Sequence, residues 1–216
     1  MLRVNAILFD FDGVVIDSEP VHAKAKKLTF EKFNIGYPET IFDDYKGKPD
    51  NVFFDYVAGS LDKNKHSSEM LHTYKKRVFE TIIKEIKLID GFILFLNTVK
   101  SKGIKTALVS STSLYSLGLV DEIYHISGMF DLVITEVDTA LHKPHPDPYL
   151  KALEKLPSDI LDCIVIEDSP NGIISAKKAG CYVYGLTSSF KGNELMKAGS
   201  DEIIENYSEL MQKLNL

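Results

Sequence analysis

Two aspartates at the end of a short apolar segment are the strongest chemical signal in the sequence. Asp10 and Asp12 flank one phenylalanine and precede Gly13, directly after the apolar run 4–9. Carboxylates at i and i+2 on an extended segment point the same way, and their repulsion is costly without a partner. Mg²⁺ would relieve that repulsion, and an aspartate beside Mg²⁺ can attack phosphorus. The alternative interpretation is a surface turn, in which Asp and Gly are common.

Hydroxyl and ammonium groups follow at two later points. Ser110 and Ser111 come after the apolar run 105–109, where they could bind phosphate oxygens or simply cap a helix. Lys143 lies in a proline-rich segment that is stiff enough to hold one ammonium in place, although most single lysines are only solvated.

A second acidic pair, Glu167 and Asp168, ends the apolar run 163–166. Hard carboxylate oxygens suit Mg²⁺, and capping of the next helix is the rival interpretation. Taken in order, the candidates supply a nucleophile, phosphate ligands, a neutralising cation and a metal site. Phosphoryl transfer needs these parts.

The elements that must position these residues can be read from the hydrophobic pattern. Apolar runs predict buried strands at 4–9, 105–109, 132–135, 163–166, 181–186 and 202–204. Helical patterns alternate with them, which predicts an α/β fold with a doubly wound parallel sheet. Ligands bind beyond the carboxyl ends of the strands in such sheets, and the candidate residues come directly after predicted strands.

Residues 18–87 differ from the rest of the chain. The segment has helical patterns without a convincing buried strand, a small positive net charge, and nearly half of the aromatic residues. We therefore predict an inserted all-helical cap domain over 18–87 and a core built from 1–17 and 88–216. An insertion directly after the first strand is placed to act as a lid.

The composition disfavours several functional classes of protein. The 216 residues carry a net charge of −6 without a basic run, which disfavours nucleic-acid binding. No stretch of 18 apolar residues and no signal-peptide pattern occur, so we expect a cytoplasmic protein without membrane contact. Cys163 and Cys181 lie in apolar surroundings and are expected to be buried free thiols. We expect a monomer.

With these motifs in hand, the sequence resembles the haloacid dehalogenase superfamily of phosphotransferases over nearly its whole length. The resemblance implies a Rossmann-like core with a four-helix cap. The segment after Asp12 and the helical insert are similar to the branch that contains β-phosphoglucomutase and small sugar-phosphate phosphatases. The matching residues are Asp10, Asp12 and Gly13 (first motif), Ser110 (second), Lys143 (third), and Glu167, Asp168, Ser169 and Gly172 (fourth).

The resemblance assigns roles to these residues. It implies that Asp10 attacks phosphorus and that Asp12 protonates the leaving oxygen and then activates water or an acceptor hydroxyl. Phosphate oxygens would be held by Ser110, Ser111 and Lys143, and Lys143 would also screen Asp10. It further implies that Mg²⁺ is held by Asp10, the backbone carbonyl of Asp12, Asp168 and Glu167, the last directly or through water.

The cap residues decide between two activities. By the same resemblance, His22, Lys46, Gly47 and Lys48 are candidate substrate contacts. Mutases of this branch carry an arginine soon after the Lys-Gly pair to hold a second phosphate, whereas Asp50 occupies that place here. Lysine lacks the bidentate fork of arginine, so this difference favours a phosphatase over a mutase. The expected substrate is a small phosphorylated metabolite, such as a sugar phosphate.

Two hypotheses from other functional classes, counted after the phosphatase or mutase, remain open. A phosphoacceptor signalling domain also surrounds an aspartate with acids, a hydroxyl and a lysine, but such domains are shorter and lack the cap. A silent family member that only binds its ligand is the third reading, although all the motif residues are present.

Overall fold

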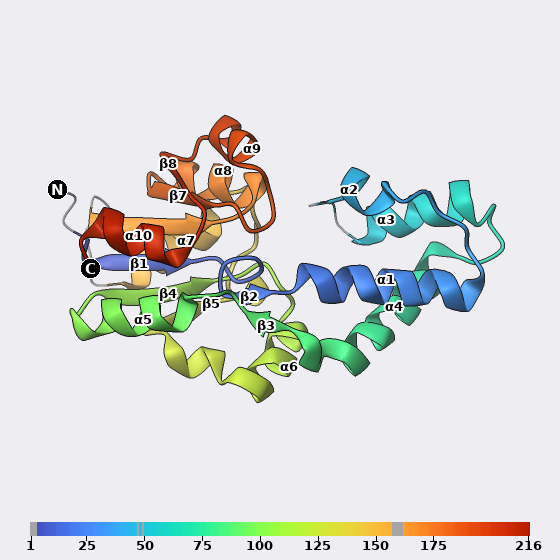
Figure 1. The fold of residues 1–216 in the computed structure, drawn as a ribbon, viewed down its shortest axis with the longest axis horizontal. Coiled ribbons are helices and arrows are strands. Elements are labelled where there is room, and N and C mark those ends of the chain that lie inside the picture. The colour runs from blue at the N-terminus through green and yellow to red at the C-terminus, as the bar shows by residue number, and fades with distance from the viewer. Residues whose placement is uncertain (1–3, 47, 49, 157–161) are drawn as a thin grey trace. The chain divides into compact units, whose positions relative to one another are not determined.

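The computed structural model describes residues 4–46, 48, 50–156 and 162–216. The chain folds into two compact units, a core unit made of Met1–Asp17 with Lys87–Leu216 and a helical unit, Ser18–Ile86. Figure 1 labels the elements of both units. Lys87 belongs to the core unit, one residue before the predicted boundary, because it pairs with Asp17. The pair belongs to a short antiparallel ribbon of β2 (Ile16–Asp17) and β3 (Lys87–Leu88). Strands of two residues are too short to be recognised from the sequence pattern.

A parallel six-stranded sheet forms the centre of the core unit. Its order is β5-β4-β1-β6-β7-β8, so the chain proceeds from β1 to β4 and β5 on one side and returns to fill the other. The order therefore reverses at β1, and the predicted α/β doubly wound sheet is confirmed. The strands are β1 (Ala6–Phe9), β4 (Lys105–Val109), β5 (Leu132–Ile134), β6 (Cys163–Glu167), β7 (Tyr182–Leu186) and β8 (Glu202–Ile204).

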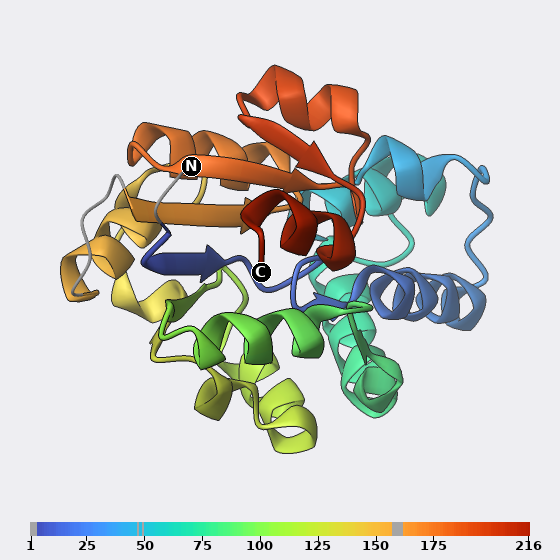
Figure 2. The ribbon, with the colours of Figure 1, turned by 60° about the vertical axis from the view of Figure 1, so that its left-hand side comes forward.

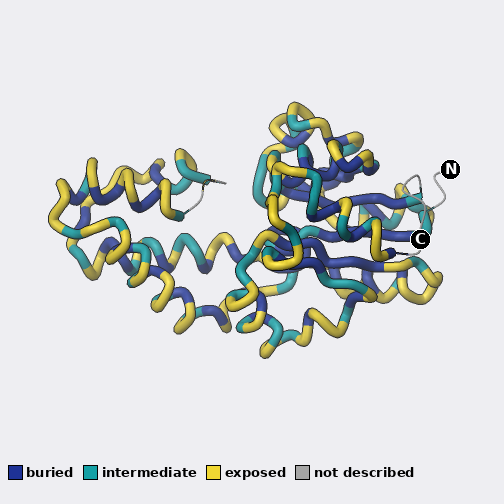
Figure 3. Tube along the Cα trace, turned by 180° about the vertical axis from the view of Figure 1, so that it is seen from behind, coloured by how far each residue is buried: buried dark blue, intermediate teal, exposed yellow. Residues whose placement is uncertain are grey.

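Helices cover both faces of this sheet (Figure 2). Side chains alternate along β1: Phe9 packs against Phe92 of α5 at 6.0 Å between ring centroids, whereas Leu8 joins the cluster that contains Tyr149 of α7. The four inner strands β4, β1, β6 and β7 are almost fully buried (Figure 3), as continuous apolar runs require, whereas the edge strands β5 and β8 are buried only at their last residue. The helices are α5 (Phe92–Ser101), α6 (Leu114–Tyr124), α7 (Asp147–Lys155), α8 (Pro170–Lys178), α9 (Gly192–Ala198) and α10 (Tyr207–Leu214).

The bounds of β4 and β8 match the prediction, and each of the other four strands differs from it by one or two residues at one end. β5 stops at Ile134 because Thr135 and Asp138 form a reciprocal cap around the short helix Glu136–Asp138. A second 3-10 helix spans Ile126–Met129. Both cysteines are buried free thiols, as predicted.

The helical unit has its own hydrophobic core. Phe30, Phe53, Phe54 and Leu71 are buried together in it. The described residues of the unit include no strand, in agreement with the pattern. Its elements are α1 (Glu19–Phe33), α2 (Ile41–Asp44), α3 (Asp50–Tyr56), a π-helix (Val57–Leu61), α4 (Ser68–Ile82) and a 3-10 helix (Ile83–Glu85). Throughout the described chain, helices fall short of the length and apolar character that a membrane crossing requires.

Candidate active site

Three adjacent strands bring the predicted site residues to one edge of the sheet. Asp10 follows β1 and its amide donates to Ile166 O at 3.0 Å, while Ser110 follows β4 and Glu167 ends β6. Because β4 and β6 both pair in parallel with β1, their carboxyl ends lie together. This is the edge, at the point where the strand order reverses, where ligands bind in doubly wound sheets.

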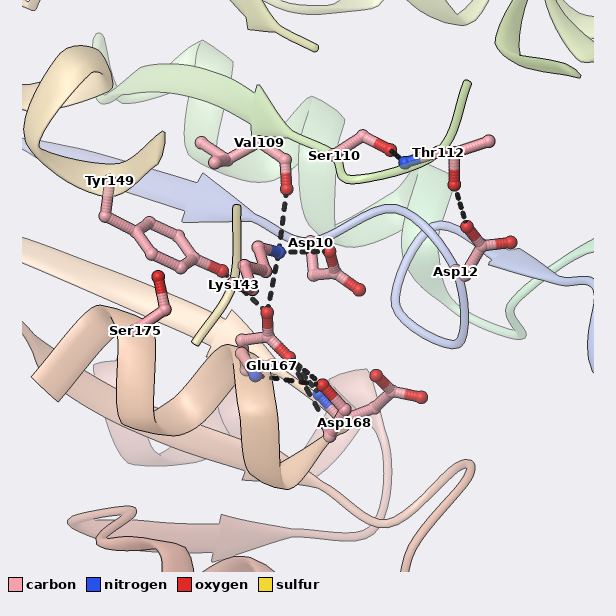
Figure 4. Close-up of polar contacts among 12 residues, drawn as sticks. Asp10, Asp12, Val109, Ser110, Thr112, Lys143, Tyr149, Glu167, Asp168 and Ser175 are labelled. Carbon is pink, nitrogen blue, oxygen red and sulfur yellow. Dashed lines mark hydrogen bonds and ion pairs between the residues drawn. The ribbon is translucent and has the colours of Figure 1, made fainter. Parts of the chain in front are cut away.

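Lys143 lies between two of the carboxylates (Figure 4). Its Nζ donates to Asp10 Oδ1, to Glu167 Oε1 at 2.7 Å and to Val109 O at 2.9 Å. An ammonium has three protons, so these three acceptors occupy all of them. Although burial alone would lower the pKa of Lys143, the Asp10 and Glu167 carboxylates raise it. Lys143 is therefore a fixed positive charge.

The loop that carries Lys143 is tied to α8. Ser175 is fully buried, and its hydroxyl donates to His145 O at 2.5 Å. The peptide bond between Lys143 and Pro144 is cis. The stiffness inferred from the prolines is thus joined by a tertiary contact that the sequence does not indicate.

Glu167 is surrounded by donors and has no exposed surface. Oε1 accepts from Lys143 and from the hydroxyl of Tyr149, the latter at 2.8 Å. Oε2 accepts from the Asp168 amide at 3.1 Å, and from the amide and hydroxyl of Ser169 at 3.3 and 3.1 Å. A buried carboxylate needs such partners. Tyr149 was not predicted from the sequence as a site residue. The sequence feature that could have indicated it is its position in the proline-rich segment, six residues after Lys143.

Three carboxylates form a cluster that could hold a cation. Oxygen atoms of Asp10, Glu167 and Asp168 all lie within 4.8 Å of one another. Burial and Glu167 raise the pKa of Asp10 to about 7, against the opposing effect of Lys143. Burial, Asp10 and Glu167 likewise raise the pKa of Asp168. Like charges held this close favour a bound cation.

The surroundings of the cluster fit Mg²⁺. The donors are hard carboxylate oxygens, which this ion prefers. The backbone approaches closely as well: a Cβ on Gly13 would lie 1.8 Å from Asp168 Oδ2, and Gly13 has a φ of +76°. Only glycine adopts this conformation readily and leaves that space open.

The side chain of Asp12 is directed elsewhere. Its Oδ2 accepts a hydrogen bond from Thr112 Oγ1, and the Thr112 amide donates to Ser110 Oγ at 2.9 Å (Figure 4). The Asp12 carboxylate is thus outside the three-carboxylate cluster. Ser111 is exposed. Thr112 is a second residue that sequence reasoning missed, and its place two positions after Ser110 in a hydroxyl-rich run is the available signal.

Two hydrogen bonds from the C-terminal part of the chain hold the loop after Asp12. The Ser188 hydroxyl donates to Gly13 O at 2.5 Å, and the buried Tyr207 hydroxyl donates to Val14 O at 2.8 Å. No local pattern marks either residue, because their role depends only on where β7 and α10 lie.

The remaining candidates lie in the helical unit. The Lys75 ammonium is within 2.8 Å of His22 Nδ1 and donates to Asp50 Oδ2 at 2.6 Å. Although burial opposes it, Lys75 and Lys26 lower the pKa of Asp50 to about 2. His22 also stacks on Phe79 at 4.2 Å between ring centroids.

The other candidate substrate contacts of this unit, Lys46, Gly47 and Lys48, follow α2 in the sequence. The Lys46 amide donates to Asp43 O at 3.3 Å, and the exposed Lys48 places its ammonium 4.3 Å from the ring centroid of Tyr45. Gly47 lies outside the described residues.

Comparison with known proteins gives a consistent picture. The family model described as haloacid dehalogenase-like hydrolase matches residues 7–186. A phosphorylated carbohydrates phosphatase of Thermotoga maritima is 31% identical over 94% of this chain and 94% of its own. Pyrophosphatase PpaX of Bacillus pumilus is 26% identical, covering 96% and 95%. β-Phosphoglucomutase of Bacillus subtilis is 26% identical, covering 98% and 93%.

A solved structure extends the likeness to three dimensions. A hydrolase of the same superfamily from Entamoeba histolytica superposes with a TM-score of 0.81 at 30% identity, covering 95% of each chain.

Proposed function

Because this chain belongs to the haloacid dehalogenase-like hydrolase family, we propose that it is a Mg²⁺-dependent phosphatase of a small phosphorylated metabolite. One observation carries this proposal. Asp10 lies at the end of the central strand, with the Lys143 ammonium on Oδ1 and two further carboxylates beside it. The groups that we assign as nucleophile, fixed cation and metal ligands thus lie at one edge of the sheet.

The first step uses Asp10 and Asp12. Since Lys143 contacts Oδ1 of Asp10, we assign the attack on phosphorus to Oδ2. The O–P bond of the ester breaks as the Asp10–phosphorus bond forms, and Asp12 gives its proton to the leaving oxygen. The Thr112 hydroxyl, which contacts Asp12 Oδ2, orients that carboxyl group.

The second step regenerates the enzyme. Asp12 takes a proton from water, the water oxygen bonds to phosphorus, and the bond to Asp10 breaks to release inorganic phosphate. The residues assigned to hold Mg²⁺ are Asp10, Asp168, the carbonyl of Asp12 and, directly or through water, Glu167. When bound, Mg²⁺ supplies positive charge that lets an anionic phosphate approach a carboxylate.

Lys143 contributes charge to this reaction. All three of its protons are already engaged within the protein. To donate to a phosphate oxygen it would release the neutral Val109 carbonyl, because its two carboxylate partners bind more strongly. The Ser110 and Ser111 segment is assigned to the other phosphate oxygens.

The proposed substrate class is a sugar phosphate. A relative with 31% identity is named as a phosphatase of phosphorylated carbohydrates. We assign the choice of substrate to the helical unit as a cap, with Lys46, Gly47 and Lys48 as candidate contacts. Lys75 and Lys26 are engaged by Asp50, so the position at which mutases carry arginine holds a neutralised acid.

Phosphate release from a panel of sugar phosphates, nucleotides and pyrophosphate, with Mg²⁺ or EDTA, tests the proposal. We expect Mg²⁺-dependent release of phosphate from a sugar phosphate, abolished in Asp10→Asn and retained in Asp131→Asn. Asp131 is a matched control because it precedes β5, outside the carboxylate cluster. Release that persists in Asp10→Asn or in EDTA would contradict the mechanism.

A mutase is the second candidate, because β-phosphoglucomutase of Bacillus subtilis is 26% identical over nearly the full length. The same panel should contain β-glucose 1-phosphate with a trace of bisphosphate primer. Formation of glucose 6-phosphate faster than phosphate release would identify the chain as a mutase. A folded protein that is inactive in both assays would favour a binding or phosphoacceptor role.

A further inference from the structure

A buried tyrosine adjoins the ion pairs of the site without a role in the mechanism above. We propose that Tyr149 is a positioning residue that holds Glu167 and Lys143 so that the Lys143 ammonium stays on Asp10. The inference rests on the proposed function and assigns to Tyr149 no contact with substrate.

The geometry gives Tyr149 two contacts with the ion pairs. Its hydroxyl donates to Glu167 Oε1 at 2.8 Å, the same oxygen that accepts from Lys143. Its ring lies 4.9 Å, measured to the centroid, from the Lys143 Nζ. The face of an aromatic ring attracts a cation at this distance. Tyr149 therefore contacts both partners of the Lys143–Glu167 pair (Figure 4).

Burial makes these contacts consequential. Tyr149 and Glu167 have no exposed surface, and the Lys143 side chain is 7% exposed. Water therefore cannot easily replace a lost hydrogen bond, and an unsatisfied carboxylate oxygen in such surroundings is costly. Without the hydroxyl, Oε1 of Glu167 would accept a hydrogen bond from Lys143 alone. We expect the ammonium to shift toward Glu167 and away from Asp10.

The alternative is that Tyr149 only fills space. It does lie in the apolar cluster between the sheet and α7. A packing role depends on the ring, whereas a positioning role depends on the hydroxyl as well. The two roles are therefore separated by Tyr149→Phe, which keeps the ring and removes the hydroxyl.

Kinetics of Tyr149→Phe on the best substrate of the panel form the first test. We expect kcat to fall about ten-fold with KM within about two-fold of wild type, since ten-fold is near the smallest effect of losing a hydrogen bond to a charged group. Tyr182→Phe is the matched control: the Tyr182 hydroxyl also donates to a glutamate, Glu202 Oε1, at 2.8 Å, but between β7 and β8. It should leave kcat unchanged. An unchanged kcat in folded Tyr149→Phe would overturn the proposal.

A double-mutant cycle gives a readout without turnover. Urea unfolding in EDTA would be compared for wild type, Tyr149→Phe, Lys143→Met and the double variant. If Tyr149 acts on Lys143, the two changes should be non-additive by about ten-fold in the unfolding equilibrium constant. Additive effects would overturn the proposal. Lys143→Gln replaces Lys143→Met in the cycle if the latter does not fold.

The two readouts keep the proposals apart. If the wild-type protein hydrolyses no phosphate ester, the proposed function fails, while the unfolding cycle still decides whether Tyr149 holds Lys143. If the enzyme is active and the cycle is additive, the function stands and the role of Tyr149 is refuted.

Discussion

Replacing Asp10 by asparagine should make the metal-free protein more stable at neutral pH. The folded chain raises the pKa of Asp10 from 3.8 to about 7 through burial and the Glu167 carboxylate, against Lys143. The Asp10 side chain is 13% exposed, so solvent screens it little. At about 1.4 kcal/mol for each pH unit between the two values, ionised Asp10 lowers the free energy of unfolding by about 4 kcal/mol.

The pH dependence follows from the sign of this change. A group whose pKa is higher in the folded state gives stability that is complete below pH 3.8 and is lost as pH rises to about 7. Asp10→Asn should therefore exceed wild type by about 4 kcal/mol at pH 8 and by about 1 kcal/mol at pH 4.5. Mg²⁺ should narrow this difference at pH 8, because a ligand at 100 times its Kd stabilises the folded wild type by about 2.7 kcal/mol, which offsets more than half of it.

Urea unfolding in EDTA at the two pH values, followed by circular dichroism, measures these differences. Asp131→Asn is the control of opposite sign. Against the effect of burial, hydrogen bonds from Thr106 and Lys105 lower the pKa of Asp131, so its loss should destabilise the protein at pH 8. An Asp10→Asn variant that is less stable than wild type at pH 8 would contradict this prediction, because the contact with Lys143 would then outweigh burial and repulsion.

Three further predictions concern single contacts. Gly172→Ala would place a Cβ 1.8 Å from Glu167 Oε1 and should lower both the activity and, by about 1–3 kcal/mol, the free energy of unfolding. Gly118 also lies in a helix, but a Cβ there meets no atom within 4 Å, so Gly118→Ala should raise the free energy of unfolding by up to about 1 kcal/mol. Thermal unfolding of the two variants measures both changes. Thr112→Val removes the donor to Asp12 and should lower kcat about ten-fold, while Thr112→Ser should retain most of it; equal kcat values for the two variants would contradict the orienting role. Folding lowers the pKa of Asp50 from 3.8 to about 2, so Asp50→Asn should lower the free energy of unfolding by about 2 kcal/mol at pH 7. In urea titrations this difference should fade as the pH falls from 3.8 to about 2. A loss of stability that persists at the lower pH would have another origin.

The sequence alone determined the sheet and the position of the motifs on it. Continuous apolar runs marked the six strands of the parallel sheet to within two residues, because burial on both faces requires apolar side chains at every position. Since Asp10, Ser110 and Glu167 stand at the ends of such runs, their meeting at one edge followed from parallel pairing. Local pattern was sufficient there because burial constrains each residue separately.

Most contacts between side chains of the site depend on the tertiary structure. Thr112 donates to Asp12 across 100 residues of sequence, and no motif indicated this contact. The contact of Lys143 with Asp10, 133 residues away, was implied by the family resemblance and not by local pattern. Tyr149 is buried like an apolar core residue, yet its hydroxyl donates to Glu167. Hydrophobic periodicity specifies that a side chain is buried and leaves its neighbours open. Those neighbours depend on strand register and helix placement, which the whole chain sets cooperatively.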